Sequence, residues 1–174
     1  NSKMPKKLPA LFIGRFQPFH LGHIDAIRQI LSRENHVIIA IGSAQYHFQP
    51  DNPWTTSERF QMIQAGLADA GVPPDRYTII PVWNIEDYKN WPNHMDNLLP
   101  PYDAVYSGSP LTRRLYHEQG KHEIHGIKML EGISATMIRK KMLTQENWKK
   151  FLTKNIVALL EKWDSVQRLK DIQK

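Results

Sequence analysis

The stretch GRFQPFHLGH, residues 14–23, stands between an apolar run and a segment with helical periodicity. The apolar run, residues 8–14, predicts a short buried strand that ends in glycine. In the segment that follows, residues 24–31, the apolar side chains Ile24, Ile27 and Ile30 share one face of a helix. Strand, short turn and helix in this order indicate the first unit of a parallel sheet.

The rest of the chain repeats this alternation. Four further strands are expected, at residues 36–42, 77–83, 103–107 and 122–128. Helices are expected from a capping box at Thr55 and Glu58, over residues 91–99 and 110–119, and through most of 134–174. The predicted fold class is α/β, a Rossmann-like open, mostly parallel sheet with helices on both faces and a helical C-terminal segment.

Length and composition favour one ordinary globular domain. The chain has 174 residues, of which 41% are hydrophobic, and it shows no long linker. We expect a single domain over residues 8–174, preceded by a flexible tail at residues 1–7. The absence of cysteine excludes a disulfide scaffold, a thiolate zinc site and a cysteine nucleophile. No apolar run approaches the roughly 18 residues of a membrane span, and no secretory signal is visible, so we expect a cytoplasmic protein without membrane contact.

The formal net charge of +6 is concentrated at the two ends of the chain. Residues 1–7 carry three lysines, and residues 139–174 carry ten basic against four acidic side chains. A nucleic-acid-binding surface is one interpretation. A solvated helical surface is favoured over it, because few aromatic side chains for base stacking lie among these charges. No nucleic-acid partner is expected.

Residues 14–23 have the features of a phosphate site. In open α/β sheets, ligands bind at the carboxyl ends of the strands, and a helix N-terminus there offers free N–H groups to an anion. His20 and His23 are three residues apart at the beginning of the helix, where two imidazoles can donate to phosphate oxygens. Gly22 lets a nucleotide approach the backbone. A metal site is the alternative, but no third ligand is evident nearby, so none is predicted.

A second motif lies about 110 residues further on. Ser134 is a good N-cap, Thr136 adds a hydroxyl in the first turn, and Arg139 follows one turn later. Hydroxyls, backbone N–H groups and a guanidinium can together hold the β- and γ-phosphates of a nucleotide. Taken alone, this pattern is more typical of a capped helix with a solvated arginine. Its interpretation as a phosphate site depends on the first motif.

The two motifs together resemble a known family. HxGH after a strand is similar to the nucleotidyltransferase superfamily, and GRFQPFHLGH with ISATMIR at residues 133–139 resembles the archaeal-type nicotinamide mononucleotide (NMN) adenylyltransferases. The resemblance covers roughly residues 9–170. It implies that His20, His23, Arg139 and Arg15 are catalytic. The ATP-binding residues that it implies are Gly14, Arg15, Phe16, His20, Gly22, His23, Tyr106, Ser107, Gly108, Ile133, Ser134, Thr136 and Arg139.

The acceptor side is also inferred from the resemblance, through the segments GSAQ at 42–45 and NPWTTSER at 52–59 and through Trp91, which in the family stacks on the nicotinamide ring. Arg59 has two equally weighted interpretations, a structural ion pair with a carboxylate or a ligand contact. The NMN-binding residues that the resemblance implies are Gln17, Ser43, Ala44, Gln45, Asn52, Trp54, Ile85, Tyr88 and Trp91.

This sequence departs from the family pattern at two places. Asp51 stands where a phosphate-binding base is frequent, and Tyr88 replaces a polar amide three residues before the tryptophan. Both positions bear on the acceptor and not on the transfer chemistry.

The activity that the resemblance implies is transfer of AMP from ATP to the 5′-phosphate of NMN, which gives NAD and pyrophosphate. The acceptor phosphate is already an anion, so no general base is required. Mg²⁺ is expected to bind mainly through the ATP phosphates, and a homo-oligomer is expected. The alternatives are another acceptor (nicotinate mononucleotide, FMN or phosphopantetheine), a non-catalytic sensor of NAD or ATP, and a nucleic-acid-binding protein.

Overall fold

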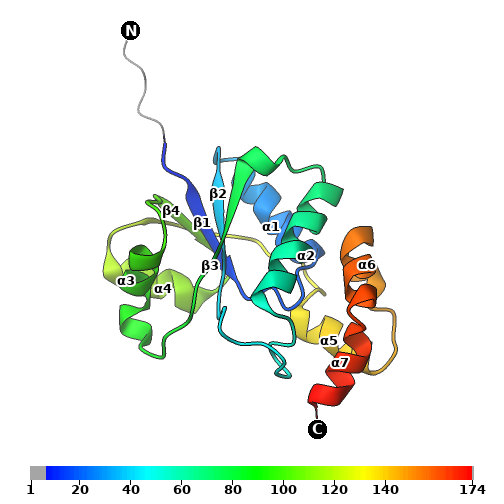
Figure 1. Cartoon of the computed structure of the whole chain (residues 1–174). Helices are drawn as coiled ribbons and strands as arrows, with labels where there is room; N and C mark the ends of the chain where they lie inside the picture. Colours follow the sequence, from blue (N-terminus) through cyan, green and yellow to red (C-terminus); the bar gives the residue numbers. More distant parts are fainter. Residues whose placement is uncertain (1–6, 174) are drawn as a thin grey trace.

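The computed structural model describes residues 7–173 and contains one five-stranded parallel sheet. The strands lie in the order β3-β2-β1-β4-β5, and each pairs in parallel with its neighbour. Figure 1 shows helices on both sides of this sheet, so the predicted α/β architecture is confirmed. The strands are β1 (Ala10–Gly14), β2 (Val37–Ile41), β3 (Tyr77–Pro81), β4 (Ala104–Ser107) and β5 (Glu123–Gly126).

The helices begin close to where the capping residues place them. Thr55 and Glu58 form the expected capping box, and Ser134 is the N-cap of the first C-terminal helix. One helix begins at Leu21, earlier than its apolar spacing indicated, because His20 is its N-cap. The helices are α1 (Leu21–Leu31), α2 (Thr56–Asp69), α3 (Trp91–Leu98), α4 (Pro110–Gln119), α5 (Ala135–Leu143), α6 (Lys154–Lys162) and α7 (Ser165–Ile172).

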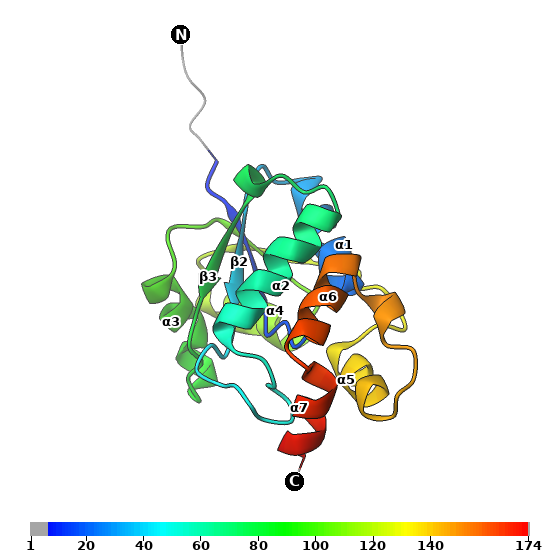
Figure 2. The same cartoon turned by 45° about the vertical axis from the view of Figure 1, so that its right-hand side comes forward.

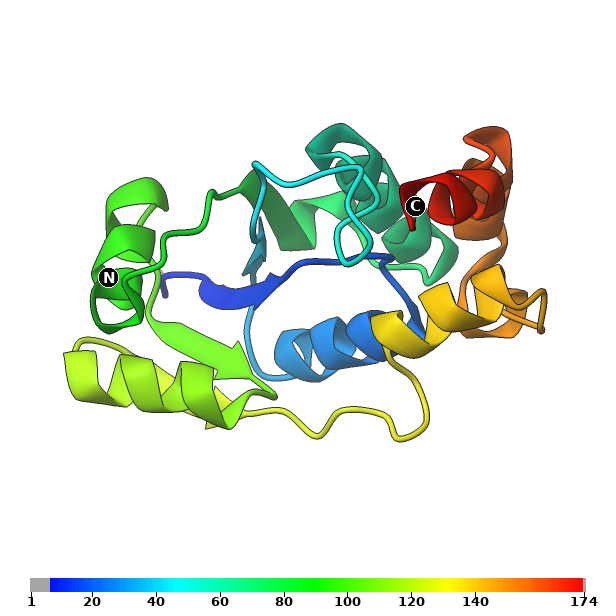
Figure 3. The same cartoon turned by 90° about the horizontal axis from the view of Figure 1, so that it is seen from below.

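Alternate residues of the central strands point into two separate cores. On one face, Phe12 and Ile39 pack with apolar side chains of α1, α2, α5, α6 and α7. On the other face, Leu11 and Ile38 pack with α3 and α4. Figure 3 shows the two groups of helices on opposite sides of the strands. The continuous apolar run in β2 follows from this arrangement, because both of its faces are covered.

The helical C-terminal segment lies against the larger of the two helix layers. Figure 2 shows α6 beside α2 and α7 beside α5. Arg168 on α7 donates two hydrogen bonds, of 2.7 and 2.8 Å, to the carboxylate of Glu58. This bidentate ion pair is mostly buried and fixes α7 to the beginning of α2.

The third and fifth strands are shorter than the sequence indicated, and the fifth ends at Gly126 and not at Lys128. The third strand ends at Pro81 and not at Trp83, and it is an edge strand, where a proline does not interrupt the pairing of the sheet. The expected tail lies outside the described residues except for Lys7, whose Nζ is 2.9 Å from Glu34 Oε2. Among the described residues, no helix is both long and apolar enough to span a membrane.

Candidate active site

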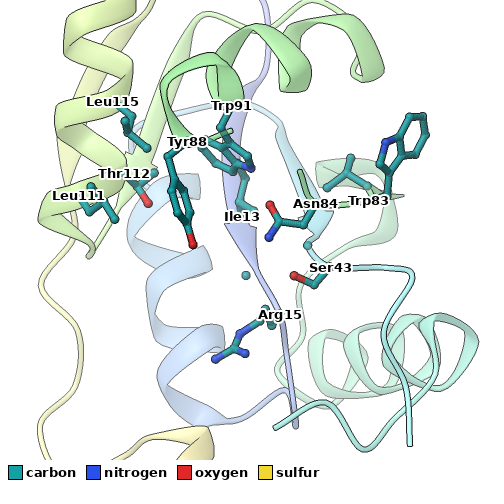
Figure 4. Close-up of a pocket in the computed structure, with 13 residues that line it drawn as sticks. Ile13, Arg15, Ser43, Trp83, Asn84, Tyr88, Trp91, Leu111, Thr112 and Leu115 are labelled. Carbon is teal, nitrogen blue, oxygen red and sulfur yellow. The ribbon is translucent and has the colours of Figure 1, made fainter. Parts of the chain in front are cut away.

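A pocket of about 210 Å³ lies at the carboxyl edge of the sheet, where β1, β2 and β3 end (Figure 4). This is the position where open α/β sheets bind ligands. Its far wall comes from the segment before α3 and from the first turns of α4. The lining residues are Ile13, Gly14, Arg15, Gly42, Ser43, Val82, Trp83, Asn84, Tyr88, Trp91, Leu111, Thr112 and Leu115.

The two histidines of the HxGH motif cap their own helix. His20 Nδ1 accepts a hydrogen bond of 3.0 Å from the N–H of Gly22, and His23 Nδ1 accepts one of 3.1 Å from the N–H of His20. Because both Nδ1 atoms act as acceptors, a neutral ring carries its proton on Nε2 in each case. Neither Nε2 has a protein partner among residues 7–173. The cap therefore leaves two Nε2–H donors for a ligand.

Both imidazoles are held in their neutral form. Burial lowers the pKa of His20 to about 4. Burial, and then the neighbouring His20, lowers the pKa of His23 well below its ordinary value. The two rings stack at 3.7 Å, and Phe19 lies parallel to His23 on the other side, at 5.5 Å between ring centroids. At neutral pH this pair can supply hydrogen bonds to an anion without a positive charge of its own.

Arg139 joins the second motif to the first. Its Nη1 donates a hydrogen bond of 2.8 Å to the carbonyl oxygen of Gln17, across 122 residues of sequence. Its Nη2 lies 3.5 Å from Thr136 Oγ1 and 3.6 Å from a carboxylate oxygen of Asp51. The Asp51 side chain is 79% exposed, so a ligand phosphate can replace it at the guanidinium. Asp51, one of the two residues at which the sequence departs from the family pattern, thus lies beside the expected triphosphate site.

The beginnings of α1 and α5 lie side by side. A Cβ on Gly22 would be 2.8 Å from His20 Cε1 and 3.9 Å from the side chain of Ile133, just before α5. Gly22 is therefore required by the close approach of the His20 ring. Ser134 Oγ accepts a hydrogen bond of 3.1 Å from the N–H of Met137, as an N-cap does, and its own hydroxyl hydrogen can still be donated. Two helix N-termini at one place favour phosphate.

Three arginines converge on this edge of the sheet. Burial is the main cause that lowers the pKa of Arg139, with a further lowering by the charge of Arg15 and an opposing effect of Asp51. Burial, and then Arg15, lowers the pKa of Arg59 to about 10. Arg15 itself is exposed and lines the pocket. The positive field and the free guanidinium of Arg15 are suited to an anionic ligand.

Arg59 does not form the ion pair that was considered for it. Its side chain is fully buried and donates to backbone carbonyl groups and to Thr56 Oγ1, with no carboxylate partner among residues 7–173. The hydrogen bonds to Arg15 and Gly42 are 3.0 and 2.9 Å long. They fix the loops after β1 and β2, where Phe16 and Ser43 have positive φ angles of 54° and 50°. Arg59 thus holds two strained loops at the site.

Of the residues expected at the acceptor, Ser43, Tyr88 and Trp91 line the pocket, while six others do not: Gln17, Ala44, Gln45, Asn52, Trp54 and Ile85. The side chains of two of them are bonded to other parts of the protein. Trp54 is fully buried, and its Nε1 donates to Ser165 Oγ at 2.9 Å. The Gln17 amide is bonded to both backbone groups of Trp54. These polar atoms stabilise the contact of α7 with the loop before α2.

The residues around the end of β4 that were expected to bind ATP are partly occupied by contacts within the protein. Tyr106 is buried, and its hydroxyl donates to Glu34 at 3.0 Å, so this hydroxyl is not available to a nucleotide. Ser107 Oγ accepts a hydrogen bond from the N–H of Ser109. Gly108 is required by close packing, because a Cβ there would be 2.7 Å from Met129 Cγ. Backbone and loop atoms, and not the Tyr106 hydroxyl, remain for contact with a base.

Several lining residues were not identified from the sequence. Asn84 is one residue beyond the expected third strand, so the rule that sites form at strand ends could have indicated it. Leu111 and Thr112 lie in the first turn of α4 after β4, and the same rule applies to them. Ile13 and Val82 have no such signal, because an apolar residue at a strand end is ordinary core.

The parallel sheet, the HxGH cap and the arginine from the second motif define an α/β nucleotidyltransferase of the HxGH class. A family model described as cytidylyltransferase-like matches residues 11–141. Nicotinamide-nucleotide adenylyltransferases of Methanolobus tindarius and Picrophilus torridus are 40% and 37% identical, over 95% and 94% of this chain and 94% and 96% of theirs. The chain belongs to the cytidylyltransferase-like family and, within it, to the nicotinamide-nucleotide adenylyltransferases.

One similar solved structure contains a bound nucleotide and a metal ion. A bifunctional NMN adenylyltransferase/ADP ribose pyrophosphatase from Francisella tularensis, complexed with AMP and a manganese ion, superposes with a TM-score of 0.81 at 26% identity. The match covers 96% of this chain and 52% of that one. This chain therefore spans about half of the bifunctional protein.

Proposed function

We propose that this protein transfers AMP from ATP to the 5′-phosphate of NMN and releases pyrophosphate. The observation that carries the proposal is the position of Arg15, where the pocket meets the loop that holds the HxGH motif. Arg15 lines the pocket at the end away from Trp91 and lies in the loop that leads from β1 to the HxGH cap. A flat pyridinium ring fits beside an indole, and the phosphate attached to its ribose then points toward the cationic end.

The reaction is an in-line displacement. An oxygen of the acceptor phosphate forms a bond to the α-phosphorus of ATP while the bond to the bridging α–β oxygen breaks, and pyrophosphate leaves with that oxygen. His20 and His23 donate their Nε2–H groups to phosphate oxygens as negative charge shifts, and Arg15 and Arg139 compensate that charge. Because the nucleophile is already ionised, catalysis consists of positioning and electrostatic stabilisation.

Mg²⁺ enters this scheme as part of the substrate MgATP. Among residues 7–173 no group of three histidine or acidic side chains could hold a metal ion. Mg²⁺ prefers phosphate oxygens and water to a full set of protein ligands, so such a group is not needed. The manganese ion in the Francisella tularensis relative supports use of a divalent cation. Replacement of Mg²⁺ by Mn²⁺ in an activity assay tests which ion is preferred.

One incubation tests the proposal. Protein, ATP and Mg²⁺ are divided among NMN, nicotinate mononucleotide, FMN and phosphopantetheine, and the products are separated by chromatography. We expect NAD and pyrophosphate in equal amounts in the NMN sample. Product only with FMN or phosphopantetheine would move the acceptor and retain the mechanism. Binding of NAD without any product would favour a sensor.

The remaining expectations concern the state of the protein. We propose a single domain over residues 8–174, a homo-oligomeric assembly, a cytoplasmic location, and no nucleic-acid or membrane partner. A single cooperative unfolding transition and a particle mass above 20.3 kDa in light scattering are the expected results for domain and assembly. Steeply salt-dependent binding to mixed-sequence RNA would contradict the expectation of no nucleic-acid partner.

A further inference from the structure

Asn84 lies at the end of the edge strand with its backbone fixed from two sides. The Gln45 side chain donates to the carbonyl oxygen of Asn84 at 3.0 Å and accepts from its N–H at 3.0 Å. This bidentate bond joins the loops after β2 and β3. Gln45, which was itself expected at the acceptor, thereby orients Asn84.

The side chain of Asn84 points into the pocket. Figure 4 shows its amide group between Trp91 and Ser43, directed toward the open space. It lines the pocket, and its Oδ1 and Nδ2 have no hydrogen-bond partner among residues 7–173. A side-chain amide that lines a pocket, on a backbone held by hydrogen bonds, is suited to recognise a ligand.

The position of charge in the pocket also bears on what the Asn84 amide can bind. Among residues 7–173, Arg15 is the one charged side chain that lines the pocket, and Figure 4 shows it at the end away from Trp91. The proposed reaction places the acceptor phosphate at Arg15. A ring that lies beside Trp91 then carries its substituent between the Asn84 amide and Tyr88, at the end of the pocket opposite Arg15.

We infer that the Asn84 side-chain amide reads the substituent of the pyridine ring and selects a neutral carboxamide over a carboxylate. This inference rests on the proposed function, because it assigns the ring end of the same pocket. A carboxamide offers both an N–H donor and a carbonyl acceptor, so it can pair with both atoms of the Asn84 amide. A carboxylate only accepts, which leaves Asn84 Oδ1 opposite a negative oxygen, and it loses hydration without a counter-ion.

The test compares kcat/KM for NMN and for nicotinate mononucleotide in three variants. In the unaltered protein we expect a preference for NMN of at least about tenfold, the order produced by one unmatched polar group. Asn84→Ala should reduce this ratio toward one, mainly through a higher KM for NMN, while KM for ATP stays the same. Asn84→Asp should raise the ratio, because its carboxylate still accepts from the carboxamide and repels the nicotinate.

A matched control is Asn97→Asp, which adds the same charge at an exposed position on α3. It should leave the ratio unchanged. If Asn84→Ala and Asn84→Asp both retain the ratio of the unaltered protein, the inference is overturned while the proposed function stands. If the unaltered protein makes no dinucleotide from either mononucleotide, the proposed function itself fails. Thermal unfolding of each variant separates a loss of fold from a change in specificity.

Discussion

The phosphate site and the acceptor pocket are built in different ways. The phosphate site depends on local geometry: His20 and His23 cap their helix through bonds that span two or three residues, and Ser134 caps α5 in the same way. The acceptor pocket is assembled from segments far apart in sequence, such as Gly14, Ser43 and Asn84. Chemistry that many relatives share can thus be encoded in short motifs, whereas selection of an acceptor depends on how the segments meet.

The largest expected effect concerns the phosphate site, which depends on local geometry. His23→Ala removes the Nε2–H donor that the proposed mechanism directs at the ATP phosphates and should reduce kcat by about 10²–10³, the loss found when one preorganised donor is removed. The KM for NMN should change little, since the acceptor pocket is intact. Steady-state kinetics with each substrate varied in turn would measure both values.

His23→Gln is the matched control for this variant. Glutamine at the third helical position can still accept from the backbone N–H of residue 20, so the cap is retained while the Nε2–H donor is displaced. The thermal midpoint should remain close to that of the unaltered protein and kcat should stay depressed. Full activity in either variant would contradict the role assigned to His23.

The next largest effect concerns contacts between segments that lie far apart in the sequence. Arg59→Ala leaves several backbone carbonyl groups at the ends of β1 and β2 without their donor, in a fully buried place. The free energy of unfolding should fall by about 3 kcal/mol or more. Urea titration measures this. Arg28→Ala is the control, because Arg28 donates one exposed hydrogen bond to Ala70 and its loss should cost roughly 1 kcal/mol or less.

The pH dependence of stability tests the neutral state of the histidine cap. The unfolded chain protonates His20 near its ordinary pKa of 6.5, whereas the folded protein does so only at about 4. The unfolded state therefore binds more protons between these values, and the free energy of unfolding decreases as the pH falls from 6.5 to 4. For His20 the decrease approaches roughly 3 kcal/mol. Urea titrations at pH 7.5, 5.5 and 4.5 would measure the slope, and a His20→Gln variant with the same slope would refute this assignment.

The smallest expected effect concerns the exposed contact between Asp51 and Arg139. Asp51→Asn removes the carboxylate that lies 3.6 Å from Arg139. In the proposed mechanism a phosphate of ATP has to compete with this carboxylate for the guanidinium. Because Asp51 is mostly solvated, we expect a KM for ATP lower by about two- to threefold, with an unchanged thermal midpoint. A higher KM for ATP would mean that Asp51 helps to bind the nucleotide instead of competing with it.

Much of the fold was predictable because its signals are local. Apolar runs and the alternation of strands with helices predicted all five strands, and the caps at Thr55 and Ser134 predicted two helix beginnings. The candidate site was less predictable. Trp54 and Gln17 were expected at the acceptor, but α7 covers Trp54, and Gln17 bonds to the Trp54 backbone. No local pattern indicates which aromatic residue a helix more than 100 residues away will bury.

The sequence by itself determined the parallel α/β architecture, the HxGH helix cap and the serine that begins α5. These features follow from side-chain periodicity and from hydrogen bonds between residues two to four positions apart. The tertiary structure decided that Arg59 is a buried support, that Arg139 reaches the carbonyl group of Gln17, and that Asn84 faces the pocket. The contacts of Arg59 and the placement of Asn84 depend on the strand order β3-β2-β1, and that of Arg139 on the approach of α5 to the loop after β1, which no short segment specifies.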